Sequence, residues 1–123
     1  MEIEMTPLPK TWILDLDGTL VKHNGYKLDG RDTLLPDARD ILSQIEKDDM
    51  VIILTSRTAD HAKATEDFLK SAGIRYDHII YEAPCGERIL INVRKPSGRD
   101  MAYAVNTDRD SSAALHILRN PAL

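Results

Sequence analysis

The sequence predicts a single α/β domain built around a mainly parallel sheet. Short apolar segments typical of buried strands recur along the chain, and segments with helical periodicity separate them. Strands that alternate with helices form right-handed βαβ units, which place the strands parallel. A chain of 123 residues is long enough for one core of this kind. We therefore expect one three-layer Rossmann-like domain over residues 1–123, with its core at about 11–107.

The individual elements follow from composition and spacing. The expected strands are, in chain order, residues 12–16, 50–54, 78–81, 89–92 and 101–105. Pro36 is expected to open the first helix, because its fixed φ suits a first helical turn. Apolar residues at 38, 41, 42 and 45 then form one buried helical face. A second helix is expected from about residue 59 to 72, with Gly73 as its C-terminal cap.

Composition excludes several classes of protein. Sixteen Lys and Arg against twenty Asp and Glu give a net charge of −4, which argues against a nucleic-acid partner that binds through basic side chains. The single cysteine, Cys85, excludes an internal disulfide and any multi-cysteine zinc site. No apolar run approaches the ~20 residues of a membrane span, and the N-terminus lacks a signal-peptide pattern. We expect no membrane partner and a cytoplasmic location.

Polar residues follow the first two predicted strands. Asp15 and Asp17 lie two residues apart and point to the same side of an extended chain. Their mutual repulsion requires a cation, a shared proton or a helix N-terminus. Thr55, Ser56 and Arg57 end the second strand, where a hydroxyl and backbone N–H groups can hold a phosphoryl oxygen. The alternatives are a simple turn at Asp17 and a helix cap at Ser56.

Two of these segments resemble motifs of the haloacid dehalogenase superfamily. Residues 12–21 (WILDLDGTLV) resemble its first motif, and residues 51–57 (VIILTSR) its second. The resemblance spans roughly residues 11–107 and implies a five-stranded sheet in the order 5-4-1-2-3 without a cap domain. The nearest likeness is to small capless phosphatase-like members associated with phosphosugars and surface polysaccharides. Residues 86–96 (GERILINVRKP) resemble the end of that pattern.

The resemblance also implies a mechanism and its residues. Asp15 would attack phosphorus, Asp17 would act as general acid and base, and Thr55 would hydrogen-bond the phosphoryl group. Mg²⁺ would be the cofactor, held by an oxygen of Asp15, the backbone carbonyl of Asp17 and the side-chain carbonyl of Asn92. Either Arg88 or Lys95 would neutralise charge on the phosphoryl oxygens.

A long loop at residues 21–35 would act as a flap over the substrate. Its residues His23 and Asn24, together with Ser56 and Arg57, are the candidate substrate-binding residues. A site without a cap could use a second copy of the chain as its lid, so a homo-oligomer is a further expectation. Whether residues 111–123 pack on the sheet or exchange with a neighbour is left open by the sequence.

One position departs from the family pattern. Val93 stands where a metal-binding aspartate is expected, and the loss of a carboxylate weakens attraction for Mg²⁺. The sequence therefore predicts a Mg²⁺-dependent phosphomonoester hydrolase that acts through an aspartyl-phosphate on a small phosphorylated metabolite, with a sugar phosphate favoured. The alternative is a catalytically impaired module of the same fold that binds a phosphate ligand or has a regulatory role.

Overall fold

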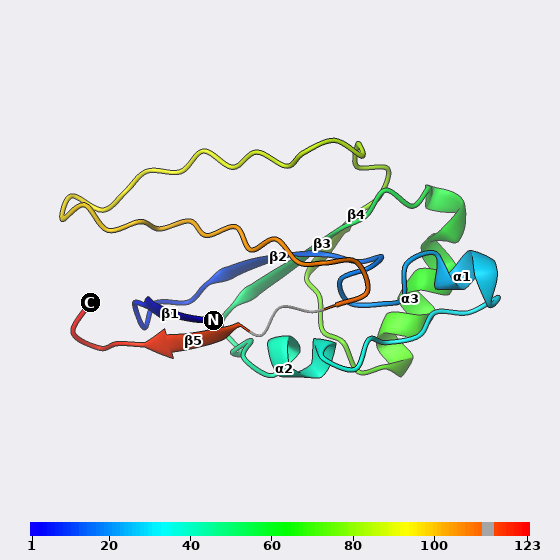
Figure 1. Cartoon of the computed structure of the whole chain (residues 1–123), viewed down its shortest axis with the longest axis horizontal. Helices are drawn as coiled ribbons and strands as arrows, with labels where there is room; N and C mark the ends of the chain where they lie inside the picture. The colour runs from blue at the N-terminus through cyan, green and yellow to red at the C-terminus, as the bar shows by residue number, and fades with distance from the viewer. Residues whose placement is uncertain (112–114) are drawn as a thin grey trace.

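The chain folds as a mixed α/β structure with two small parallel sheets (Figure 1). The computed structural model describes residues 1–111 and 115–123. The elements in chain order are β1 (Glu2–Met5), β2 (Thr11–Asp15), α1 (Gly25–Leu28), α2 (Ala38–Leu42), β3 (Met50–Leu54), the 3₁₀ helix η1 (Ala59–His61), α3 (Ala62–Ser71), β4 (His78–Ile80) and β5 (His116–Arg119). The α/β class predicted from the alternating segments is confirmed.

The larger sheet contains the first three predicted strands. Its order is β2-β3-β4, and both pairs are parallel. In this register Asp15 lies beside Leu54, and Leu54 lies beside Ile80. The carboxyl ends of β2 and β3 therefore meet at one edge of the sheet, as expected for a parallel arrangement.

The core lies on one face of this sheet. Trp12 and Leu14 of β2 are buried, whereas Ile13 between them is 49% exposed, so successive β2 side chains alternate between core and solvent. Helices α2 and α3 contribute Ile41 and Leu69 to the same core. Coverage on both faces, expected for a parallel sheet, is not seen at Ile13.

The predicted five-stranded sheet is not formed. Residues 89–92 and 101–105 carry no strand, and residues 83–108 run out and back as a long excursion from the end of β4 (Figure 1). The excursion turns at Lys95–Gly98, where the Gly98 N–H donates to the Lys95 carbonyl. Ile91 is 92% exposed. An apolar run becomes a strand only where a neighbouring strand edge takes up its backbone hydrogen bonds. Within residues 1–111 and 115–123, no strand pairs with residues 89–92 or 101–105.

The second sheet was not anticipated. Strands β1 and β5 pair in parallel over their whole lengths, from Glu2 beside His116 to Met5 beside Arg119. The part of the C-terminal segment at 115–123 thus packs against the N-terminus of its own chain, whereas the part at 112–114 lies outside the described residues. Among the described helices none is long and apolar enough to cross a membrane.

One predicted helix is shorter than expected, and the other has the expected extent. The first, expected from Pro36, is the short helix α2, whereas the second, expected from about 59 to 72, is formed by η1 and α3 together. Gly73 follows α3 with a φ of 70°, a left-handed conformation that suits glycine at a helix C-terminus. Within the expected flap, residues Gly25–Leu28 form the additional helix α1.

A buried carboxylate joins β2 to the start of β3. Asp49 is 5% exposed and accepts hydrogen bonds from the Trp12 ring N–H and from the backbone N–H groups of Lys10 and Glu46. Burial alone would raise the pKa of Asp49, but these donors outweigh it and hold that pKa below its ordinary value. The carboxylate fixes the entry of both strands into the sheet.

Candidate functional site

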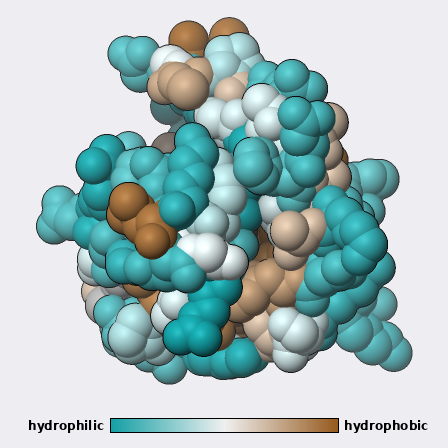
Figure 2. Space-filling model, turned by 90° about the vertical axis from the view of Figure 1, so that its right-hand side faces the viewer, coloured by the Kyte–Doolittle hydropathy of each residue, from teal (hydrophilic) through white to brown (hydrophobic). Residues whose placement is uncertain are grey.

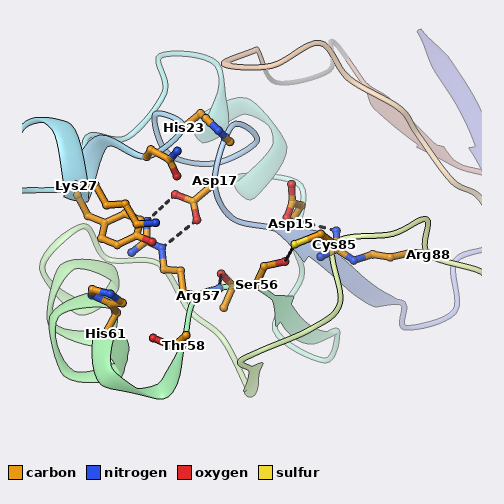
Figure 3. Close-up of a pocket in the computed structure, with 13 residues that line it drawn as sticks. Asp15, Asp17, His23, Lys27, Ser56, Arg57, Thr58, His61, Cys85 and Arg88 are labelled. Atoms are coloured by element: carbon orange, nitrogen blue, oxygen red, sulfur yellow. Dashed lines mark hydrogen bonds and ion pairs between the residues drawn. The ribbon is translucent and has the colours of Figure 1, made fainter.

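A pocket opens where β2 and β3 end. It has a volume of about 460 Å³, within the ~300–1,000 Å³ typical of small-molecule sites. The face of the molecule that carries α1 and α3 is mostly hydrophilic, with scattered hydrophobic patches (Figure 2). The pocket is lined by Asp15, Asp17, His23, Asn24, Tyr26, Lys27, Thr55, Ser56, Arg57, Thr58, His61, Cys85 and Arg88 (Figure 3). Most of the candidate site residues from the sequence are thus brought together.

Asp15 lies at the partly open side of this pocket. Its carboxylate accepts a hydrogen bond from the Thr19 hydroxyl at 3.1 Å and is paired with Arg88 at 3.4 Å. The side chains of Arg88 and Asp15 are 42% and 40% exposed. An ion pair this exposed contributes about 0–1 kcal/mol, so Arg88 can leave Asp15 for an anionic ligand at little cost.

Asp17 is held very differently, by the buried Arg57. The Arg57 guanidinium donates to both Asp17 oxygens, at 3.0 and 2.8 Å, and to both Asp32 oxygens, at 2.9 and 2.7 Å. It also donates to the Thr65 hydroxyl. Burial alone would lower the pKa of Arg57, but the bonds to Asp32 and Asp17 outweigh it and raise that pKa. Arg57 is therefore the positively charged partner of both carboxylates.

This ion-pair cluster changes the expected roles of two residues. Arg57 was expected to bind substrate, and Asp17 to transfer protons and bind metal. In the structure Arg57 has its guanidinium committed to Asp17, Asp32 and Thr65, and Asp17 has both oxygens committed to Arg57. Thr55 is also engaged, since its buried hydroxyl accepts the Arg57 backbone N–H. The cation that relieves the repulsion between Asp15 and Asp17 is thus Arg57 on one carboxylate and Arg88 on the other.

The other side of the pocket is aromatic. The Tyr26 and His61 rings lie 4.9 Å apart between centroids and meet edge to face at 70°. The Arg57 guanidinium carbon lies 3.9 Å from the Tyr26 ring centroid, and the Lys27 ammonium lies 5.6 Å from it. In Figure 3, His61 and Lys27 lie on the opposite side of the pocket from Cys85 and Arg88.

A second, smaller pocket adjoins the first and brings in residues that the sequence analysis missed. It has a volume of about 280 Å³ and shares Asp15, Asp17 and His23 with its neighbour, while Arg109 and Thr107 line its outer part. The His23 backbone N–H donates to Asp110, which fixes the 107–110 turn beside the loop before α1. No sequence motif near Arg109 predicts that it lines a pocket. Arg109 lies there because the chain comes back to the end of β2 after the 83–108 excursion.

Two predicted site residues lie outside both pockets. Lys95 forms the turn of the excursion, and the neighbouring Arg99 donates to the Glu4 carbonyl of β1. Asn92 is exposed on the same excursion, and its amide donates to the Val93 carbonyl. Both were expected at the end of a strand that does not form, so the excursion carries them away from Asp15. Of the two candidate cations, Arg88 is the one in the pocket.

The predicted Mg²⁺ site does not fit the residues present. Within residues 1–111 and 115–123, no group of three His, Cys, Asp or Glu side chains is arranged to hold a metal ion. Asn92, the third expected ligand, lies outside both pockets, and the Asp17 carboxylate, which could have replaced it, is bonded to Arg57. Mg²⁺ prefers an octahedral shell of oxygen ligands, and this arrangement offers no such set. We derive no step through a metal.

The chain is similar to parts of two solved structures. No protein-family model and no curated protein matches the chain. A chain in a solved structure of a Pnkp1/Rnl/Hen1 complex is 31% identical, with a TM-score of 0.53 over 69% of this chain and 32% of that one. A chain in the structure of the Pnkp1/Rnl/Hen1 RNA repair complex is 30% identical, with a TM-score of 0.52 over 70% of this chain and 30% of that one. The chain thus spans about a third of the length of these solved chains.

These findings correct the functional part of the sequence analysis. The similar structures are components of an RNA repair complex, so the assignment to the haloacid dehalogenase superfamily is wrong. The prediction of a phosphatase for a small metabolite such as a sugar phosphate, and its alternative of an impaired module of the same family, are wrong with it. The expectation of no nucleic-acid partner is overturned by the same similarity to chains of an RNA repair complex.

Proposed function

We propose that this chain is an RNA-end-processing domain that binds the phosphate-bearing end of an RNA strand in the pocket at the ends of β2 and β3. The observation that carries the proposal is the identity of about 30% to chains of an RNA repair complex, over a segment that includes most of this chain. The ligand chemistry follows from the pocket. Its open side offers a guanidinium and hydroxyl groups, which are donors suited to a terminal phosphate.

Arg88 and Ser56 are the phosphate contacts in this proposal. Arg88 is half-exposed and only weakly held by Asp15, and a guanidinium forms stronger, bidentate bonds to a phosphate. The Ser56 hydroxyl lies on the same side, where it accepts from the Cys85 thiol at 3.5 Å. Asp15 then remains beside the phosphate and repels it, so a ligand must displace the carboxylate from Arg88 to bind. A terminal phosphate presents three oxygens to the guanidinium, and a phosphodiester within a strand presents two, so the terminal phosphate can bind Arg88 in a bidentate manner while one oxygen points away from Asp15.

Recognition of an end also agrees with the overall charge. A chain with a net charge of −4 cannot neutralise many phosphates along a strand. Each phosphate neutralised on a single strand contributes about −0.7 to the slope of log affinity against log salt concentration. Binding through one terminal phosphate and one neighbour predicts a slope of about −0.7 to −1.5. A slope as steep as about −4 would instead indicate binding along the backbone.

The test compares two exposed arginines of the same excursion. Arg88 lines the pocket, whereas Arg94 is paired with Asp100 outside it. A charge-assisted hydrogen bond is worth about 1.5–3 kcal/mol, and the exposure of Arg88 places it at the lower end. Arg88→Met should therefore weaken binding of a phosphate-ended RNA about tenfold in fluorescence anisotropy, while Arg94→Met should leave it unchanged. Equal affinities for both variants and the wild type would reject this site as the phosphate contact.

A further inference from the structure

We infer that Tyr26 and His61 form a nucleobase subsite of the same pocket, which stacks the base of the terminal nucleotide whose phosphate Arg88 binds. The inference rests on the proposed function and specifies its ligand as a nucleotide end rather than a bare phosphate. Aromatic side chains are the usual platforms for bases of single-stranded RNA, because every base has a π-face. The pocket combines such a platform with a phosphate contact.

The edge-to-face geometry leaves ring surface available. When two rings meet at 70°, one ring presents its edge to one face of the other. If the edge of Tyr26 points at His61, it covers one face of the His61 ring. If the edge of His61 points at Tyr26, both faces of the His61 ring are clear of Tyr26. In either arrangement at least one His61 face is free of Tyr26. Since His61 is partly exposed and lines the pocket, that ring is the surface on which a base stacks.

The Tyr26 ring is held in place before any ligand arrives. Arg57 lies 3.9 Å from its centroid, and that guanidinium is itself fixed by Asp17, Asp32 and Thr65. A ring that is already ordered loses little entropy when a ligand packs against the pair. The ion-pair cluster thus holds the Tyr26 ring in position. In this arrangement the role of the buried Arg57 is to support Tyr26 and not to contact the phosphate.

The aromatic pair and the phosphate contact lie on opposite sides of one pocket. His61 and Lys27 face Cys85 and Arg88 across the pocket (Figure 3), and Ser56 and Arg57 lie between them. The cavity of about 460 Å³ is of the size that buries a ligand as large as a nucleotide. Lys27 is exposed beside the aromatic pair, so its ammonium can meet the next phosphate of the strand.

The test measures the base contact separately from the phosphate contact. The assay uses two short RNAs with the same terminal phosphate. One has a base on its last ribose, and the other has an abasic last ribose. The pair is made twice, once with a 5′-phosphate and once with a 3′-phosphate. Wild type, His61→Ala, His61→Phe and the exposed control His78→Ala are titrated with each RNA. A 2-aminopurine base at the terminal position reports stacking directly through quenching of its fluorescence.

Stacking of one base predicts a loss of roughly 5- to 150-fold when the platform is removed. We expect the wild type to prefer the base-bearing end by at least about fivefold, His61→Ala to abolish that preference, and His61→Phe and His78→Ala to retain it. A wild type that binds both ends equally, or 2-aminopurine that is not quenched, would overturn the subsite and leave the proposed function intact. A wild type that binds neither phosphate-ended RNA would overturn both.

Discussion

Replacement of Arg57 by methionine should strongly destabilise the fold. The Arg57 side chain is 2% exposed, and those of Asp32 and Asp17 are 5% and 18% exposed. Without the guanidinium, two carboxylates remain close together with little access to water. Removal of one partner from a buried ion pair costs about 3–5 kcal/mol. Because Asp17 retains some solvent contact, we expect about 3 kcal/mol, a large part of the ~5–15 kcal/mol that holds a typical domain folded.

The assay is urea and thermal unfolding followed by circular dichroism. An unfolding entropy of about 2.1 cal/mol/K per residue gives about 4 °C per kcal/mol for a chain of this length, so the midpoint should fall by about 12 °C. Arg39→Met, at an exposed arginine of α2, is the matched control and should change stability by less than about 0.5 kcal/mol.

A second variant separates the charge effect from a packing effect. Addition of Asp17→Asn and Asp32→Asn to Arg57→Met removes the uncompensated charges and should restore at least half of the lost stability. If Arg57→Met costs less than about 1 kcal/mol, or if the triple variant is no more stable than the single one, the reasoning about the buried cluster is refuted.

Three further predictions concern the core and the excursion. Trp12→Phe removes the ring donor to buried Asp49 and should cost about 1–3 kcal/mol in urea unfolding; an unchanged midpoint would contradict this. Because the Asp49 pKa is lowered in the folded state, its stabilising contribution is present above the unfolded value of about 3.9 and is lost as pH falls through the folded value. Unfolding free energies should therefore drop more steeply below about pH 4 for the wild type than for Asp49→Asn, and identical slopes would contradict the assignment. Ile91→Lys, at a 92% exposed position, should change the free energy of unfolding by less than about 0.5 kcal/mol. Ile53→Ala, in the buried strand β3, should lower it by about 2–5 kcal/mol in the same assay. A large loss for Ile91→Lys would contradict the exposure of the excursion.

Local patterns were sufficient to place the centre of the sheet. The apolar runs around Trp12, Ile53 and Ile79 form adjacent parallel strands, and their polar ends converge as parallel strands require. The prediction that Asp15 and Thr55 line one pocket follows from this rule and the order of elements. The pattern of apolar residues therefore predicts a strand correctly where a neighbouring strand pairs with it and one of its faces packs on the core.

Contacts between distant segments could not be read from such patterns. Nothing near Arg57 indicates that it pairs with Asp32, because the two residues meet only after the loop before α2 folds back. The run around Ile91 has the composition of a strand, but composition does not specify a partner edge. Val93 was singled out as a missing metal ligand, yet it is 83% exposed on an excursion away from the pocket, so its identity does not bear on that site.

The family inference failed for a related reason. A short motif such as the one around Asp15 specifies a strand end with two carboxylates, and several chemistries use that arrangement. The identity to chains of an RNA repair complex extends over 69–70% of this chain rather than over one motif. That similarity supports our proposal that the pocket binds an RNA end, in which Tyr26 of α1 and His61 of η1 form a base contact that the motif did not suggest.

The most direct test of the account is the affinity of the wild-type chain for two RNAs that differ only at one end. One carries a terminal phosphate and the other a hydroxyl, and both are titrated by fluorescence anisotropy at two salt concentrations. We predict that the phosphate-ended RNA binds at least about tenfold more tightly, which is the value of one charge-assisted contact, with a salt slope no steeper than about −1.5. Equal affinity for both ends, or no binding of either, would contradict it.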